Sequence, residues 1–433
     1  MVSIHYPNYN KPMISPKKLF YNPSIPLKYR SNFMHMYFEI GWFGVLSGST
    51  VNFLNVYATR LGATAFQIGL ISAVPAVVSL LFAIPAGRWL EAHAMGRAVF
   101  WTSVFYRIGF LCFIPLPWLL GAQGQIWALV VLNLMMGIPL VALSVGFSTL
   151  FAESVPTEWR AYVAGMRNIV LSVMFMITSL VSGYLLNHIA FPHNYQVIFL
   201  IGFIGAAMSS YHLYFIKPIQ AEQASATVTL SELTAQKKPE NPRATWLTAI
   251  RSDVWSTPYR STLLVMMAFH ITQYLALPVF PLFFVRYLNL TDQNLGIGTA
   301  LFYLAVLLSS TQLNRLVRHI GHKNVTGWGL IGLAFYPALL AISSQVWHYY
   351  GISILGGLAW SLVGGAYANY VLENCPEDDR PAHLAWYNII LNASILIGSL
   401  LGPAIAENIT MPVALAVFGL ARLLAGFAII KWG

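Results

Sequence analysis

The chain has 433 residues, of which 57% are hydrophobic and only 9% are charged. A soluble globular chain carries about 25% charged residues, so this composition excludes a soluble enzyme or a disordered chain and indicates an integral membrane protein. The apolar runs are continuous rather than alternating, which argues against an outer-membrane barrel. The net charge of +10 is scattered over several loops. It therefore points to membrane topology and anionic lipid, and we predict no nucleic-acid partner.

Segments of about 17–25 mainly apolar residues, the length that crosses a bilayer, recur along the whole chain. We predict twelve membrane-spanning helices, at 34–58, 66–86, 98–120, 126–151, 166–186, 195–216, 261–285, 293–313, 324–344, 347–372, 384–405 and 410–431. The predicted organisation is a basic tail (1–33), a six-helix bundle (34–216), a polar linker (217–260) and a second six-helix bundle (261–433). The fold class is thus an all-α integral membrane protein.

Basic residues indicate the orientation. All but four of the 24 Lys and Arg residues fall on the side of the tail, the linker and the C-terminus. The positive-inside rule then places both termini in the cytoplasm of a multi-pass plasma-membrane protein, or of the inner membrane if the source is bacterial. Of the exceptions, Arg60 and Arg286 lie in loops on the opposite side, whereas Arg107 and Arg422 lie inside spans.

The two halves share sequence elements. Glu153-Ser-Val-Pro-Thr-Glu-Trp-Arg160 at the end of span four matches Glu373-Asn-Cys-Pro-Glu-Asp-Asp-Arg380 at the end of span ten. A weaker match joins the segment from Arg60 to Gly69 with the segment from Arg286 to Gly296, each in the first loop of its half. Matches in the same order indicate duplication of a six-helix unit.

This layout resembles the major facilitator superfamily. Gly87, Glu91, Gly96 and Arg97 form a degenerate version of the family signature in the loop between spans two and three, with an insertion before the second glycine. The resemblance implies a secondary transporter, in which two bundles rock about a central site by alternating access. It also implies that spans three and twelve are outer supports, so a structural or snorkelling role is favoured for Arg107 and Arg422, and pairing of Arg107 with Glu39 is one option.

Charges at the ends of spans four and ten are gate candidates. We expect Glu153 to bond Arg97 or Arg160, and Glu373 to bond Arg315 or Arg380. In this family such contacts resemble a latch that favours the outward-open state. The alternative is solvated loop charge, in which each pair contributes less than about 1 kcal/mol.

Glu39 is the one acidic residue inside a predicted span. A charge in the bilayer core costs at least about 2.5–3.5 kcal/mol, so Glu39 should face water or a partner. One interpretation makes it a proton carrier or a counter-ion for a cationic substrate, on a helix face shared with Trp42. The other places it about 9 Å inside the span, where it binds a loop arginine. Both interpretations stay open.

Span seven carries the other leading binding candidates. His270, Gln273 and Tyr274 share one helical face, and Pro278 and Pro281 interrupt the helix just beyond them. Broken backbone inside a membrane is tolerated only where it faces protein or a water-filled cavity. We therefore predict substrate contacts at these three residues, with a kinked helix and a hydrogen-bonded core histidine as the alternative.

Two embedded amides, Asn133 and Asn392, are secondary candidates for which interhelical hydrogen bonding is an equal alternative. Asn133 lies four residues before Gly137, where drug/proton antiporters of the family carry arginine. Span five also lacks their Gly-Pro-rich motif. These departures argue against the interpretation as a multidrug antiporter but do not exclude it.

The predicted function is therefore secondary active transport of a small organic solute, with proton coupling through Glu39 or His270 as an option. A multidrug/proton efflux antiporter is one alternative, and a non-transporting receptor or assembly factor with the same fold is another. We predict no enzymatic activity, no catalytic residue, no metal and no cofactor, because the chain shows no Walker loop, no CxxC and no metal-ligand cluster. Aromatic residues make up 14% of the chain, which favours a neutral or mildly cationic, partly apolar solute, and we expect a monomer.

Overall fold

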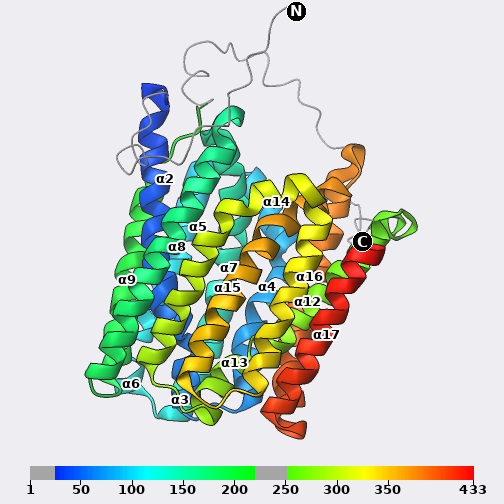
Figure 1. The fold of residues 1–433 in the computed structure, drawn as a ribbon. Coiled ribbons are helices and arrows are strands. Elements are labelled where there is room, and N and C mark those ends of the chain that lie inside the picture. Colours follow the sequence, from blue (N-terminus) through cyan, green and yellow to red (C-terminus); the bar gives the residue numbers. More distant parts are fainter. Residues whose placement is uncertain (1–24, 220–250) are drawn as a thin grey trace, which may run out of the picture.

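The computed structural model describes residues 25–219 and 251–433, and these residues form helices joined by short turns. The long helices run side by side, as Figure 1 shows. We call the end where α9 stops at Tyr214 and α17 stops at Trp432 the linker end. The opposite end, which carries the turns at residues 61–64 and 288–291, is the distal end.

The first half contains six spans. They are α2 (Leu27–Leu46) continued by η1 (Ser47–Val51) and α3 (Asn52–Arg60), α4 (Ala65–Glu91), α5 (Met95–Ile108) continued by η2 (Gly109–Phe113) and α6 (Leu116–Leu119), α7 (Ala122–Ser154), α8 (Thr157–His188) and α9 (His193–Tyr214).

The second half repeats this arrangement. After η3 (Ser252–Ser256) come α12 (Tyr259–Ala276) continued by α13 (Val279–Leu282) and η4 (Phe283–Tyr287), α14 (Asp292–Ala341), α15 (Val346–Glu373), η5 (Glu377–Asp379), α16 (Arg380–Ile409) and α17 (Met411–Trp432).

The twelve predicted spans are confirmed. Helix α14 contains two of them, because Gly321 has φ 78° and ψ 162° and reverses the chain between them. The first and third spans are each divided by a short π- or 3₁₀-helical segment. The helices extend beyond the apolar runs, so α2 begins at Leu27 and α8 at Thr157 rather than at residues 34 and 166. Most of the predicted tail and linker lies outside the described residues.

Local signals position the helix ends. Thr64 and Gln67 form a reciprocal capping box at the start of α4, and the Thr291 hydroxyl accepts a hydrogen bond from the Asn294 amide at the start of α14. Pro278 follows the end of α12 at Ala276, as the sequence predicted. The first span of each half then contains a π-helical segment, η1 or η4.

The apolar core shows how the halves meet. At the distal end, one cluster of buried residues contains side chains from both halves, including Tyr57, Phe199, Phe283 and Tyr349. At the linker end the core splits in two, one cluster built only from the second half and one only from the first half. The halves are therefore packed together distally and separate toward the linker end.

Side-chain exposure agrees with this separation. Residues 80–85 of α4 are all exposed, although six successive residues turn through more than a full helical turn. In the first span of α14, none of residues 306–321 is buried. The distal parts of both helices carry many buried positions. The linker half of each helix thus carries few buried positions, as expected for the walls of an opening.

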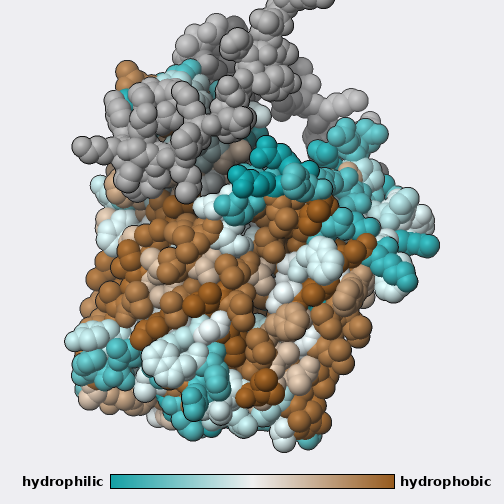
Figure 2. All heavy atoms as spheres, in the orientation of Figure 1, coloured by the Kyte–Doolittle hydropathy of each residue, from teal (hydrophilic) through white to brown (hydrophobic). Residues whose placement is uncertain are grey.

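The outer surface is typical of a protein embedded in lipid. Figure 2 shows a broad hydrophobic band between hydrophilic ends. Nine helices in the described residues are each long and apolar enough to cross a bilayer. One of them, α14, contains two spans, and the first and third spans, which are divided into shorter helices, bring the number of spans to twelve. The chain is a multi-pass membrane protein.

Candidate functional site

A cavity of about 250 Å³ lies at the seam between the halves. Asn52 of α3 reaches it from the first half, and every other residue of its lining belongs to the second half. Its polar lining consists of Asn52, Gln273, Thr299, Tyr336, Tyr349, Ser353 and Arg422. Because Arg422 lies in the middle of α17 (Met411–Trp432), the cavity lies near the midplane of the bilayer, where transporters of this architecture bind their substrates.

Arg422 is the charged residue of this cavity. Its side chain is 1% exposed. Its Nη1 donates to the Leu333 carbonyl at 3.2 Å, and its Nη2 donates to the carbonyls of Thr272 and Gln273 at 3.1 and 3.3 Å. Arg422 therefore joins α17 to α14 and to the last turns of α12. The sequence assigned Arg422 a structural or snorkelling role and missed its place in the cavity lining.

The three predicted binding residues of span seven occupy different surroundings. Gln273 lines the seam cavity, and its Oε1 has no hydrogen-bond partner. His270 is 4% exposed and its Nε2 lies 3.0 Å from the Tyr387 hydroxyl of α16. The Tyr274 side chain packs against Gly398, where a Cβ would lie 2.9 Å from the tyrosine Cβ. One residue of this helical face, Gln273, thus lines the cavity, whereas His270 and Tyr274 pack against α16.

Glu39 lies in a buried charge cluster within the first half. Arg107 Nη2 donates to Glu39 Oε1 at 3.0 Å, and Arg167 Nη1 lies 3.0 Å from Glu39 Oε2. The Ser209 hydroxyl also donates to Glu39 Oε1 at 3.0 Å. The side chains of Glu39 and Arg107 are 5% and 4% exposed. One carboxylate is therefore held by two guanidinium groups.

The optional pairing of Arg107 with Glu39 is found, and Arg167 is a partner that the sequence reasoning missed. The predicted fifth span began at residue 166, which placed Arg167 at the membrane boundary. Helix α8 begins at Thr157, so Arg167 lies well inside the bundle and is 9% exposed. The sequence signal that could have indicated Arg167 was the lone embedded acid Glu39, because one carboxylate can accept hydrogen bonds from more than one guanidinium.

The remaining binding candidates lie apart from the seam cavity. Trp42 lines a separate apolar pocket of about 470 Å³ between α2 and α8. The amides of Asn133 and Asn392 each donate to the carbonyl four residues earlier, at Leu129 and Asn388. These bonds satisfy one donor of each amide within its own helix.

A reciprocal set of contacts closes the distal end. Arg60 donates to the Leu290 carbonyl at 2.6 Å and forms an ion pair with Asp292 at 3.1 Å. Arg286 of the second half in turn donates to the Ala63 carbonyl of the first half. The Ala65 amide also donates to Glu407 at 3.3 Å. We call these contacts the distal clasp.

Two glycines allow close helix approach beside the clasp. A Cβ at Gly69 of α4 would lie 2.4 Å from the Ser399 carbonyl oxygen of α16, and a Cβ at Gly296 of α14 would lie 2.6 Å from the Ser179 carbonyl oxygen of α8. Ser179 and Ser399 are related by the same offset as the repeat at Glu153 and Glu373. Among the described residues, all the hydrogen bonds and ion pairs that link the two halves lie at the distal end.

The gate candidates at the linker end make contacts within their own halves. Arg160 donates to the carbonyls of Ala152 and Val155, which terminates α7, and Glu373 accepts from His322 at 2.6 Å. Arg380 instead pairs with Glu377 at 3.2 Å. Within the described residues, none of the expected pairs of Glu153 or Glu373 with arginine forms in this conformation. Gly87, Glu91, Gly96, Arg97 and Arg315 lie at the same end, and none of them is buried.

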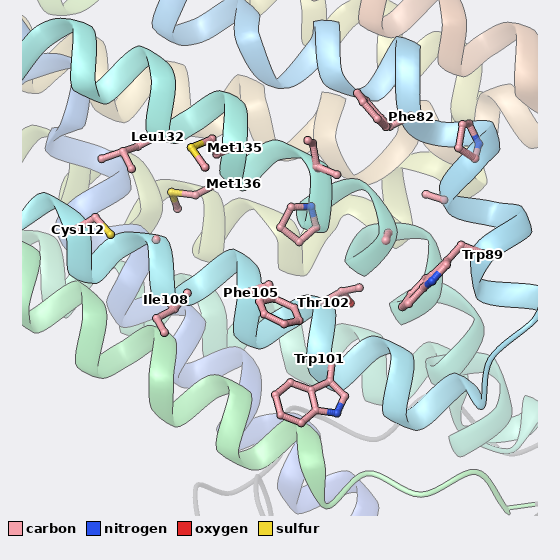
Figure 3. Close-up of a pocket in the computed structure, with 16 residues that line it drawn as sticks. Phe82, Trp89, Trp101, Thr102, Phe105, Ile108, Cys112, Leu132, Met135 and Met136 are labelled. Atoms are coloured by element: carbon pink, nitrogen blue, oxygen red, sulfur yellow. The ribbon is translucent and has the colours of Figure 1, made fainter.

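A larger cavity, of about 680 Å³, lies between α4, α5 and α7. Figure 3 shows its lining, in which Phe82, Trp101, Phe105 and Met135 surround a space without a charged side chain. Most of these side chains are exposed on the surface of the bundle. Such a lining matches lipid acyl chains rather than a polar solute.

A sequence profile of the Major Facilitator Superfamily matches residues 38–272 and 262–432. The chain belongs to the Major Facilitator Superfamily. This superfamily membership confirms the resemblance drawn from the sequence, and it supports a role in membrane transport.

A relative and several solved structures resemble this superfamily member. Multidrug resistance protein 2 of Bacillus subtilis (strain 168) is 25% identical over 139 residues, a match that spans 32% of this chain and 34% of the relative. The xylose transporter XylE from E. coli, in a partially occluded inward-open conformation, has a TM-score of 0.68 at 14% identity and covers 94% of this chain and 98% of its own. The nucleoside transporter NupG has a TM-score of 0.62 at 12% identity, with 92% and 98% covered. These likenesses show the fold.

Proposed function

We propose that this chain is a secondary transporter that carries a small organic solute across the membrane by alternating access. One observation carries the proposal: the halves share a core at the distal end and have separate cores at the linker end. Rocking the two halves about the midplane would close the linker end and open the distal end, exposing the seam cavity to each side in turn.

The linker end is proposed to be cytoplasmic, because the loops there hold nearly all the basic residues. The conformation described is then open to the cytoplasm. The plasma membrane is the proposed location, and the monomer, with its own complete pair of halves, is the proposed functional unit. Reporter fusions after Trp432 and within the turn at residues 342–345 test the orientation.

Paired distance measurements test alternating access. Spin labels at Phe66→Cys and Tyr287→Cys, both exposed positions at the distal end, report distal opening. Labels at Arg88→Cys and Arg318→Cys report the linker end, in a background that lacks Cys112 and Cys375. A thermal-shift screen of purified protein against metabolites and drugs supplies the solute. We expect the solute to lengthen the distal distance as it shortens the linker-end distance.

Two alternatives predict other results. The resemblance to Multidrug resistance protein 2 favours multidrug efflux, which predicts stabilisation by many unrelated lipophilic compounds. A receptor or assembly factor with this fold predicts that no solute changes either distance. Proton coupling is a further part of the proposal, and His270 is its stronger candidate because both oxygens of Glu39 are engaged by arginine.

A further inference from the structure

Arg422 is a buried cation that has no anionic partner among the described residues. Its three described acceptors are neutral backbone carbonyls, and its Nε has no hydrogen-bond partner. No carboxylate within residues 25–219 and 251–433 forms an ion pair with it. The contrast with the first half is sharp, because Arg107 and Arg167 both contact Glu39. Burial of a charge in the membrane is costly unless an opposite charge or a full set of hydrogen bonds compensates it.

The surroundings of Arg422 form a site that an anion can enter. The cavity of about 250 Å³ that it lines is also lined by Gln273, Thr299 and Ser353, whose amide NH₂ and hydroxyl groups are hydrogen-bond donors. Phe280, Phe302 and Trp360 supply aromatic surface on the same lining. Hydroxyl and amide groups orient a carboxylate, whereas the aromatic rings contact an apolar body. The cavity volume restricts the ligand to a small molecule.

We propose that this cavity binds a small organic carboxylate, whose anionic group pairs with Arg422 and whose apolar part lies against the aromatic residues. This inference rests on the proposed transport function for the role of the ligand as cargo. It replaces the neutral or mildly cationic solute that the sequence favoured, because Glu39 already pairs with two arginines, while Arg422 has no counter-charge within the part of the chain that the structure describes. Three of the five N–H groups of Arg422 donate to carbonyls, which leaves the Nε–H and one Nη1–H to donate to such a carboxylate.

Matched acids and amides test the proposal in detergent. The purified full chain is unfolded by heat at equal ionic strength with benzoate or benzamide, phenylacetate or phenylacetamide, and 3-phenylpropionate or 3-phenylpropionamide. Members of each pair share shape but differ in charge. We expect at least one acid to raise the unfolding temperature by about 3 °C or more at saturation, and its amide to have little effect. The heat-unfolding assay measures binding without transport, so its result does not depend on whether a transport assay succeeds.

Substitutions assign the effect to Arg422. Arg422→Gln should abolish the difference between acid and amide. Gln273→Glu supplies a carboxylate inside the cavity, so it should abolish the difference while keeping or raising the unfolding temperature of the ligand-free protein. This second variant also covers the case in which Arg422→Gln does not fold. Gln312→Glu, at an exposed position of α14, is the matched control and should keep the difference.

Three outcomes would overturn the proposal. In the first, no acid exceeds its amide in any pair, which would leave Arg422 as a structural anchor for α12. In the second, the acid effect persists in Gln273→Glu. In the third, sodium chloride at the same concentration shifts the unfolding temperature as much as the carboxylates do.

Discussion

Arg60 and Arg286 make the same kind of bond from opposite halves of the molecule. Arg60 donates to the Leu290 carbonyl, and Arg286 donates to the Ala63 carbonyl. The two arginines occupy matching positions of the internal repeat, and each donates to the turn that follows the helical segment of the other. The pseudo-twofold symmetry of the halves is therefore visible in the contacts that hold the distal end closed.

Removing the Arg60 contacts should favour distal opening. In Arg60→Gln, the ion pair with Asp292 is lost and the bond to Leu290 is weakened. A loss of about 1–2 kcal/mol would raise the ratio of distally open to closed molecules about five- to thirtyfold. The distance between labels at residues 66 and 287 measures this ratio. Arg260→Gln, outside the clasp, should leave the ratio unchanged, and an unaltered ratio in Arg60→Gln would show that the clasp does not hold the end closed.

Larger side chains at the close helix contacts of Gly69 and Gly296 should also favour distal opening. Gly69→Ala places a Cβ against the Ser399 carbonyl, and Gly296→Ala places one against the Ser179 carbonyl. Overpacking of this kind costs about 1–3 kcal/mol, and it applies only to the conformation in which these helices meet. Both variants should populate the distally open state. Gly165→Ala, with no atom within 4 Å of the added Cβ, is the control, and equal behaviour of all three variants would contradict the prediction.

Glu39→Gln should destabilise the folded protein. The change leaves Arg107 and Arg167 buried without their counter-charge, and breaking a buried pair typically costs about 3–5 kcal/mol. We expect a clear fall in unfolding temperature, and a smaller additional fall in the double variant Glu39→Gln, Arg107→Gln, because the two changes remove one shared interaction. Glu153→Gln at the linker end should have little effect. Strict additivity of the two changes would argue against the ion-pair cluster.

Proton coupling distinguishes His270 from Glu39. With the solute from the screen, His270→Gln should lose accumulation driven by a pH gradient but keep counterflow exchange, since exchange needs no net proton movement. Tyr387→Phe removes the hydrogen bond to His270 but keeps the titratable imidazole of that histidine, so the variant should retain accumulation driven by a pH gradient. Proteoliposome uptake measures both activities. Retained pH-driven accumulation in His270→Gln would exclude this histidine, and the same result in a folded Glu39→Gln protein would exclude Glu39.

The sequence by itself determined the twelve spans and their grouping into two related halves. A bilayer imposes a minimum apolar length on each helix, so hydropathy and length locate the spans, and proline and glycine mark their breaks at Pro278 and Gly321. Composition also excluded a soluble protein. The lone embedded acid Glu39 and the embedded Arg107 stood out for the same reason, because charge is rare inside spans.

Only the tertiary structure decided which of these groups meet. Hydropathy gives the depth of a residue but not the rotation of its helix, so Gln273 reaches the seam cavity while His270, on the same predicted face, packs against α16. The described partners of Arg422 are all carbonyls, whereas Arg107 shares a carboxylate with Arg167, which the shorter predicted span had left at the membrane boundary. Which end is closed depends on contacts between residues more than 200 positions apart, such as Arg60 and Asp292, and one-dimensional patterns carry no signal for such packing.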